Sequence, residues 1–354
     1  MNENMNQRPL PSSRKRAFVG FAVVCVVLLA ALGLGSDYML RYALRPSMEH
    51  SHDLSWRFHN IIDENPQLRP WADSLQRHHA LRDTFITMPT GERHHATYIL
   101  APRPSDRVAL LVHGYEDNGM GMMHIASIYH HMGFNLLLPD LHAHGRSEGE
   151  AVQMGWLDRL DVMRWMEVAN SRFGRGGNTR MVLHGVSMGA ATVMSVSGER
   201  LPSYVKCFVE DCGYTSAWDE FEGELHDRFG LPAFPLLHAC SALCRVRYGW
   251  SFDEASPLRQ VARCHKPMLF IHGDRDTFVP FSMLARLYAA KPQPKAQWVS
   301  PGSIHARSFH DHPVAYAAHV RAFVGQYISL GDSLKLNGKK QGSIRHLSLW
   351  HIDP

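Results

Sequence analysis

The chain has 354 residues, of which 45% are hydrophobic, as expected for a globular protein with a sizeable core. Its net charge of +4 is small, and its lysines and arginines are scattered rather than gathered into a basic stripe with aromatic residues. These features exclude a nucleic-acid-binding protein as the expected class. The length is that of one large domain with additional segments.

A long apolar segment near the N-terminus predicts a membrane anchor. Residues 17–36 contain no charged side chain, and as a helix rising 1.5 Å per residue they cover about 30 Å, the thickness of the hydrocarbon core. Basic residues are more numerous in 1–16 than just after the segment, so we expect residues 1–16 in the cytoplasm and the rest of the chain outside it. Secretion after cleavage of a signal peptide is the alternative, although the apolar part of a signal peptide is usually shorter.

The next segments differ in pattern. Residues 37–83 mix large apolar residues with charges and prolines, which predicts helices that lie against the main domain or the membrane surface. Two strands are predicted over 84–88 and 96–101, joined by a turn at residues 89–91. The polar tail over 331–354 is expected to be disordered.

Between residues 84 and 330, apolar strand-like runs alternate with helical segments. This alternation predicts an α/β fold, a mostly parallel sheet covered by helices on both faces. The further expected strands are 108–112, 135–138, 181–183, 205–209, 267–271 and 297–300, and the expected helices are 120–132, 156–173, one from 188, 282–290 and 313–328. Functional side chains are then expected at the carboxyl ends of the strands.

The alternation breaks between residues 214 and 257, where aromatic and aliphatic residues recur at helical spacing. We interpret this stretch as a short helical cap over the functional site, with Trp218 and Phe221 lining a substrate pocket. The alternative is an ordinary pair of helices that packs on the sheet.

Residues 185–189, Gly-Val-Ser-Met-Gly, form a candidate nucleophile elbow. In such an elbow Ser187 occupies a strained turn between strand and helix, and the flanking glycines avoid clashes that any side chain would cause. A serine hydroxyl needs a base within hydrogen-bond reach, and the base needs a carboxylate that orients it. The residues alone leave Asp274 and Asp276 open for the acid, and His305, His310 and His312 open for the base.

Four motifs together resemble the α/β-hydrolase superfamily, and within it the prolyl-oligopeptidase-like and serine-aminopeptidase-like serine hydrolases. They are His-Gly-Tyr at 113–115, the elbow at 185–189, Gly-Asp-Arg-Asp at 273–276 and Ile-His-Ala at 304–306. The resemblance covers roughly residues 84–330. It implies that Asp276 is the acid of a catalytic triad and His305 its base.

An oxyanion hole needs two N–H groups aimed at the developing negative charge. The backbone N–H of Met188, directly after the nucleophile, is one candidate, and the resemblance implies that the second belongs to Tyr115. It also implies that Asp140, in a Pro-Asp-Leu-His-Ala-His-Gly loop, has a structural role. The favoured role of His113 is to hold its loop.

The expected function is hydrolysis of a carboxylic ester through an acyl-enzyme, by a membrane-anchored serine hydrolase without a cofactor. Peptide hydrolysis by the same site is the alternative, and a catalytically inactive, anchored binding protein is a further one. No metal site is predicted, because the paired histidines at 78–79, 94–95 and 130–131 lack ligand spacing. Cys240 and Cys244 are expected to be buried small hydrophobes, with a disulfide or a metal site as the alternative.

Overall fold

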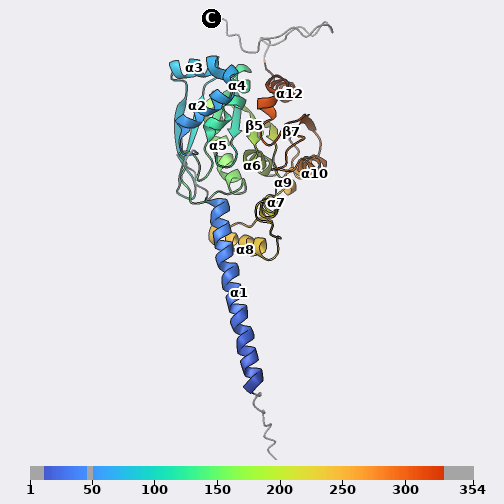
Figure 1. The fold of residues 1–354 in the computed structure, drawn as a ribbon. Coiled ribbons are helices and arrows are strands. Elements are labelled where there is room, and N and C mark those ends of the chain that lie inside the picture. The colour runs from blue at the N-terminus through green and yellow to red at the C-terminus, as the bar shows by residue number, and fades with distance from the viewer. Residues whose placement is uncertain (1–11, 46–50, 331–354) are drawn as a thin grey trace, which may run out of the picture.

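A computed structural model describes residues 12–45 and 51–330 of the chain. At the centre of the molecule lies a β-sheet (Figure 1). It has eight strands in the order β1-β2-β4-β3-β5-β6-β7-β8. β2 pairs antiparallel with both β1 and β4, and the remaining neighbours are parallel, which confirms the mostly parallel sheet. The strands are β1 Arg82–Thr87, β2 Arg93–Ile99, β3 Arg107–Val112, β4 Asn135–Pro139, β5 Arg180–Val186, β6 Val205–Asp211, β7 Met268–Gly273 and β8 Lys295–Ser300.

Helices cover both faces of the sheet and also form the two ends of the described chain (Figure 1). They are α1 Ser12–Leu44, α2 Leu54–Glu64, α3 Arg69–Arg77, α4 Met123–His131, α5 Asp158–Phe173, α6 Met188–Ser197, α7 Ala217–Phe229, α8 Leu236–Tyr248, α9 Pro257–Val261, α10 Ser282–Ala290, α11 Ser308–Asp311 and α12 Pro313–Tyr327, with 3₁₀ helices η1 Pro66–Leu68 and η2 Gly119–Met122.

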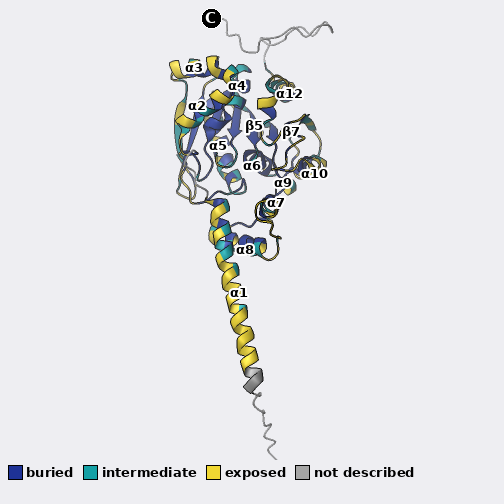
Figure 2. Cartoon of the chain, viewed as in Figure 1, coloured by how far each residue is buried: buried dark blue, intermediate teal, exposed yellow. Residues whose placement is uncertain are grey.

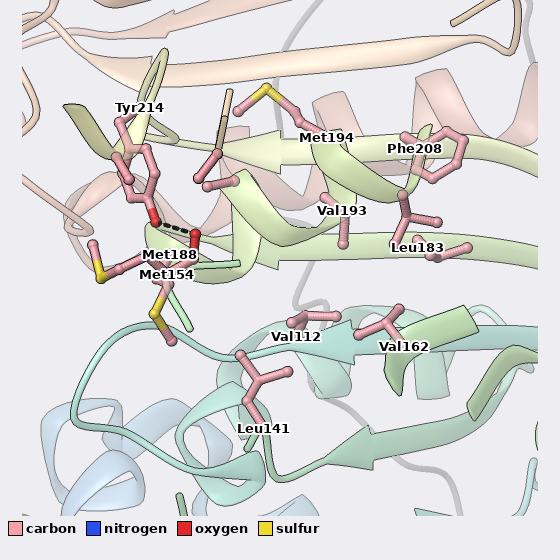
Figure 3. Close-up of a cluster of buried hydrophobic side chains, with 14 of the residues drawn as sticks. Val112, Leu141, Met154, Val162, Leu183, Met188, Val193, Met194, Phe208 and Tyr214 are labelled. Atoms are coloured by element: carbon pink, nitrogen blue, oxygen red, sulfur yellow. Dashed lines mark hydrogen bonds between the residues drawn. The ribbon is translucent and has the colours of Figure 1, made fainter. Parts of the chain in front are cut away.

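Two apolar cores lie on the two faces of the sheet. In β3, Val108 and Leu110 belong to the core shared with α5 and α6, whereas Ala109 and Leu111 belong to the core shared with α2, α4 and α12. Side chains on a strand point alternately to opposite faces, so a strand covered on both sides must be apolar throughout. Figure 3 shows part of the first core, where the Tyr214 hydroxyl donates a hydrogen bond of 2.9 Å to the carbonyl of Met154.

The helices between residues 54 and 77 pack on the domain. Ile61 of α2 and Trp71 of α3 are both 4% exposed and belong to the second core, together with side chains of α4 and α12. Their amphipathic pattern is therefore satisfied by the sheet and its helices, one of the two locations expected for this stretch.

Helix α1 projects away from the rest of the molecule (Figure 1). Its 33 residues extend about 50 Å, more than the ~30 Å of a hydrocarbon core. Side chains along its first part, such as Phe18 at 73% and Leu34 at 74%, are exposed, whereas Leu40 and Leu44 near its end are buried (Figure 2). Over Arg16–Leu44 it is long and apolar enough to be a membrane anchor or a signal sequence.

The cap segment contains two helices, α7 and α8, that lie beside the end of α1 (Figure 1). All six cysteines are free thiols, and five of them are buried, as expected of small hydrophobic residues. The tail predicted over 331–354 lies outside the described residues.

Candidate active site

Ser187 lies at an abrupt turn between β5 and α6. Its backbone has φ 57° and ψ −120°, a conformation that non-glycine residues rarely adopt. A Cβ atom at Gly185 would lie 2.1 Å from the carbonyl oxygen of Gly189, and one at Gly189 would lie 2.0 Å from that of Val112. Both glycines are thus required by close backbone approaches, and the turn has the geometry expected of a nucleophile elbow.

His305 joins Ser187 to Asp276. Its Nε2 atom is 2.8 Å from Ser187 Oγ, and its Nδ1 atom is 2.8 Å from Asp276 Oδ2. An ionised carboxylate can only accept hydrogen bonds, so Nδ1 of a neutral His305 must carry the proton and Nε2 must accept from the Ser187 hydroxyl. The fold therefore brings these three sequence-predicted residues together, in an arrangement suited to proton transfer.

Asp276 lies in a loop after β7 and is only 3% exposed. Its Oδ1 atom accepts hydrogen bonds of 3.0 Å from the backbone N–H groups of Phe278 and Val279. Burial alone raises the pKa of Asp276, but hydrogen bonds from His272 and His305 outweigh it and hold the pKa below its usual value. Asp276 thus stays ionised at neutral pH.

His272 is a contact that the sequence reasoning missed. Its Nε2 atom lies 3.3 Å from Asp276 Oδ2 and 3.0 Å from the carbonyl oxygen of Val279. Burial is the largest single effect on His272 and lowers its pKa, but the hydrogen bond to Asp276, the charge of Glu210 and the bond to Val279 together outweigh burial, so the pKa is raised. The available signal was its position four residues before Asp276, at the end of a buried strand.

The competing carboxylates hold loops instead. Asp274 is exposed, and its Oδ1 atom accepts a hydrogen bond of 2.7 Å from the N–H of Gly302. Asp140 is buried and accepts from the backbone N–H groups of Gly119 and Arg146, both at 2.8 Å, while its Oδ2 atom is 2.7 Å from His95 Nδ1.

Neither alternative histidine lies in the chain of hydrogen bonds at Ser187. His310 Nδ1 is 2.7 Å from the guanidinium of Arg307, and His312 Nε2 is 2.8 Å from the carbonyl oxygen of Pro301. His113 holds its own loop: Nδ1 is 2.7 Å from the carbonyl oxygen of Gly114, and Nε2 accepts a hydrogen bond of 2.9 Å from the N–H of Leu141.

The two expected oxyanion-hole residues are Met188, which directly follows Ser187, and Tyr115. Met188 is the first residue of α6, where backbone N–H groups lack helical partners and the helix dipole favours an anion. Tyr115 follows Gly114, at which an added Cβ would be 3.4 Å from Ser187 Cβ. The hydroxyl of Tyr115 donates a hydrogen bond of 2.8 Å to the carbonyl of Ala43, which ties this loop to α1.

Ser187 and His305 line a cavity of about 830 Å³, near the upper end of the ~300–1,000 Å³ typical of small-molecule sites. Phe221 of α7 belongs to its wall, whereas Trp218 is not among the described residues that line it. The ring of Trp218 packs against His238 with centroids 4.8 Å apart, which corrects the expected position of this residue. The apolar part of the wall consists of Met39, Leu40 and Ala43 of α1, Phe221, Leu225 and Phe229 of α7, and Leu236, Leu237 and Cys240 of α8, together with residues of α2 and of nearby loops.

Glu220 of α7 is a buried acid in the cavity wall. It is 6% exposed, and its Oε2 atom has no hydrogen-bond partner among the described residues. Burial, with a smaller contribution from Glu224, raises the pKa of Glu220 to about 8. At neutral pH this carboxyl is therefore mostly protonated and can donate a hydrogen bond into the cavity.

Two groups of three potential metal ligands occur within the described ranges. One comprises Cys212, Asp276 and His305, and therefore shares two residues with the hydrogen-bonded chain at Ser187. The other, Glu92, His94 and His142, does not belong to the cavity wall. The rings of His94 and His142 lie 5.6 Å apart, a contact between separate segments that the adjacent histidine pairs in the sequence did not predict.

Comparison with known proteins agrees with this architecture. The chain is 27% identical over 227 residues to the uncharacterized protein YqkD of Bacillus subtilis, covering 64% of this chain and 74% of that protein. It is 23% identical over 231 residues to the uncharacterized protein YfhR of Escherichia coli K12, covering 62% of this chain and 72% of that one.

Among solved structures, the esterase Pf2001 of Pyrococcus furiosus superposes with a TM-score of 0.57 at 21% identity, covering 71% of this chain and 93% of the esterase. A puromycin-hydrolyzing peptidase of Mycobacterium tuberculosis superposes with a TM-score of 0.53 at 18% identity, covering 70% of this chain and 39% of the peptidase. At such identities these likenesses establish the α/β-hydrolase fold.

The model of the prolyl oligopeptidase family matches residues 124–331, more than half of the chain. This range includes Ser187, Asp276 and His305. The resemblance expected from the four motifs is confirmed: the chain belongs to the prolyl oligopeptidase family and is a serine hydrolase of the α/β-hydrolase fold.

Proposed function

We propose that the protein cleaves carboxylic esters through an acyl-enzyme intermediate, with Ser187 as the nucleophile. The observation that carries this proposal is the chain of 2.8 Å contacts from Ser187 through His305 to Asp276 at the wall of a largely apolar cavity. Ser187 Oγ attacks the carbonyl carbon while its proton passes to His305 Nε2. The N–H groups of Tyr115 and Met188 donate hydrogen bonds to the carbonyl oxygen and stabilise the negative charge that develops on it.

Collapse of this intermediate breaks the bond to the alcohol, which leaves with the proton from His305. A water molecule, deprotonated by His305, then attacks the acyl-enzyme. Collapse of the second tetrahedral intermediate breaks the bond to Ser187 Oγ, which takes the proton back from His305, and releases the acid. Throughout, Asp276 stays ionised and stabilises the imidazolium. These steps need no cofactor.

Labelling with a fluorophosphonate probe tests the nucleophile. Wild-type protein should be labelled and should hydrolyse p-nitrophenyl esters, whereas Ser187→Ala should do neither while keeping the wild-type melting temperature. Absence of labelling and turnover in folded wild-type protein would instead support an inactive binding protein.

Peptide hydrolysis is the second candidate, and Glu220 is the observation that favours it, since a carboxylate in the cavity wall can bind the amino group of a peptide. The raised pKa of Glu220 favours ester hydrolysis over peptide hydrolysis, because a protonated acid carries no charge to attract an ammonium group. Glu220→Gln mimics the protonated acid. For an esterase the variant should keep its ester rates, and for an aminopeptidase it should lose hydrolysis of aminoacyl-naphthylamides.

We further propose that α1 is an uncleaved anchor with its N-terminus in the cytoplasm. The buried side chains Leu40 and Leu44 support this, because the helix continues without interruption from its exposed apolar part into the domain. The protein should stay with membranes after a carbonate wash, and external protease should digest the domain in spheroplasts. A soluble product lacking about the first 36 residues would identify a signal peptide instead.

A further inference from the structure

We infer that the substrate is an amphiphilic ester with a long acyl chain that resides in the lipid bilayer and enters the cavity from the membrane side, beside α1. This inference rests on the proposed esterase activity and on the proposed anchor. It requires that the exposed apolar residues of the cap contact the bilayer.

The cavity wall begins beside the end of the apolar part of α1. Gly35 ends the apolar stretch, and an added Cβ there would contact Leu236 of α8 at 3.7 Å. Leu236 itself lines the cavity, as does Met39, one helical turn after Gly35 and about 6 Å along the axis. An apolar surface therefore continues from the edge of the exposed helix to the cavity that contains Ser187.

Helix α8 lies across α1. Cys240 Sγ donates to the carbonyl of Ser36 at 3.7 Å, and Arg247 pairs with Asp37 at 2.6 Å. Between Leu236 and Arg247, α8 covers about 16 Å along its axis. The residues of α1 that it contacts over this length, 35 to 37, cover only about 3 Å along the axis of α1. The two helices therefore cross steeply (Figure 1). If α1 spans the bilayer, α8 lies roughly in the plane of its surface, the orientation of an interfacial helix.

Large apolar side chains are exposed around this crossing. Phe234 is 72% exposed and Val246 is 86% exposed, with Phe229 and Leu231 each at 41%. The loop over residues 230–235 contains no charged residue, and Arg245 next to Val246 is 68% exposed in its side chain. Apolar side chains with a flanking cation are the composition of a membrane-contacting surface.

Together these features match a substrate that never leaves an apolar environment. Its acyl chain can slide from the bilayer along α1 into the wall formed by α1, α7 and α8, and its carbonyl can reach Ser187. A short, water-soluble ester needs no such route and can enter without the cap contacting a membrane. The inference therefore predicts a difference between two classes of ester on one enzyme.

The test uses the full-length protein in phosphatidylcholine vesicles with two substrates that share a leaving group. 4-Methylumbelliferyl acetate is soluble, and 4-methylumbelliferyl oleate is incorporated in the vesicles. The double variant Phe234→Ser, Val246→Ser should lower the rate on vesicular oleate by about tenfold or more, because two apolar side chains are lost from the bilayer contact. Its acetate rate should remain within about twofold, as is usual for exposed positions.

Val314→Ser is the matched control, because Val314 is 59% exposed but lies on α12, at the opposite end of the molecule from α1 (Figure 1). It should leave both rates unchanged. Phe234→Trp retains an apolar side chain suited to the interface and should keep the oleate rate near that of wild type.

Wild-type rates of the double variant on vesicular oleate would overturn the inference, as would wild-type protein that cleaves acetate but not vesicular oleate. Wild-type protein that cleaves neither substrate would overturn the proposed esterase activity as well. The acetate rate thus distinguishes failure of the membrane route from failure of the enzyme assignment.

Discussion

The edge of the sheet at Ser187 and the wall of the adjacent cavity are built in different ways. At the edge, Ser187, Asp276 and His305 follow the ends of parallel strands. Backbone contacts hold the first two: the N–H of Ser187 donates to the carbonyl of Asp211 at 2.8 Å, and two N–H groups donate to Asp276. The wall combines α1 with α7 and α8, which lie far away in the sequence. The edge is thus determined by local backbone geometry, and the wall by side-chain packing between distant segments.

This difference predicts how each region responds to mutation. A change at the edge should alter the rate by orders of magnitude, because it removes a group that acts on the reacting atoms. A change in the wall should alter the preference among substrates or the stability, because many side chains share the same surface. Variants of similar residues within one region, or one from each region, should therefore differ in rate, substrate preference or stability.

The largest effect is expected from the two acids of the Gly-Asp-Arg-Asp loop. Asp276→Asn should lower kcat by about 10³- to 10⁴-fold, because the amide orients the wrong tautomer of His305 and cannot stabilise the imidazolium. Asp274→Asn should change kcat/KM by no more than about threefold, since its amide oxygen can still accept the hydrogen bond from Gly302. Rates on a soluble ester measure both.

Circular dichroism and melting temperature should confirm that both variants are folded. A well-folded Asp274→Asn protein without turnover, next to an active Asp276→Asn protein, would contradict the assignment of the acid.

The edge was largely predictable from sequence because its residues occur in short motifs next to apolar runs. Strand ends of a parallel sheet meet along one edge, so locating the strands also brought Ser187, Asp276 and His305 to one place. The choice of Asp276 over Asp274 came from family resemblance. Its physical basis is that Asp276 turns inward to two backbone N–H groups while Asp274 faces solvent.

The wall was not predictable in the same way. The pattern of α7 indicated helix but not which face meets the cavity, so Phe221 was placed correctly on the wall and Trp218 was not. The contribution of α1 had only a general signal: residues 37–44 belong to the mixed segment expected to lie against the domain or the membrane, and only tertiary packing brings Met39 and Leu40 to the cavity. The raised pKa of Glu220 likewise depends on burial that the sequence does not display.

A second comparison uses one buried glutamate from each region. Burial raises the pKa of Glu210, at the end of β6, and of Glu220, in the wall, to about 8 in each case. In the unfolded chain both titrate near 4.5, so between that pH and 8 the unfolded state releases a proton that the folded state keeps. The free energy of unfolding therefore falls as pH rises through this window.

Burial lowers the pKa of histidines such as His124 to about 4. Such histidines make the free energy of unfolding rise with pH, but only below their pKa of about 6.5 in the unfolded chain. The interval from pH 6.5 to 8 therefore excludes these histidines, and the contribution of His272, whose pKa is raised, is common to wild type and variants. Over it, Glu210→Gln and Glu220→Gln should each reduce the fall in stability by about 1–2 kcal/mol. Urea unfolding at the two pH values measures this, and an unchanged slope in either variant would show that its glutamate is ionised in the folded protein.

The smallest effect is expected from two aromatic residues of α7, three positions apart. Phe221 lines the cavity and packs on Phe252 with ring centroids 4.5 Å apart, whereas Trp218 packs on His238 outside the wall. Each methylene buried against a complete apolar wall contributes about 0.8 kcal/mol, or about fourfold in kcat/KM. Phe221→Ala should lower this increment along a series of p-nitrophenyl esters from C2 to C8, whereas Trp218→Ala should leave the series parallel to wild type and lower the stability by about 1–3 kcal/mol. Parallel series for both variants would remove Phe221 from the acyl-binding wall, and a flattened series for Trp218→Ala would show that the cavity extends to the far side of α7.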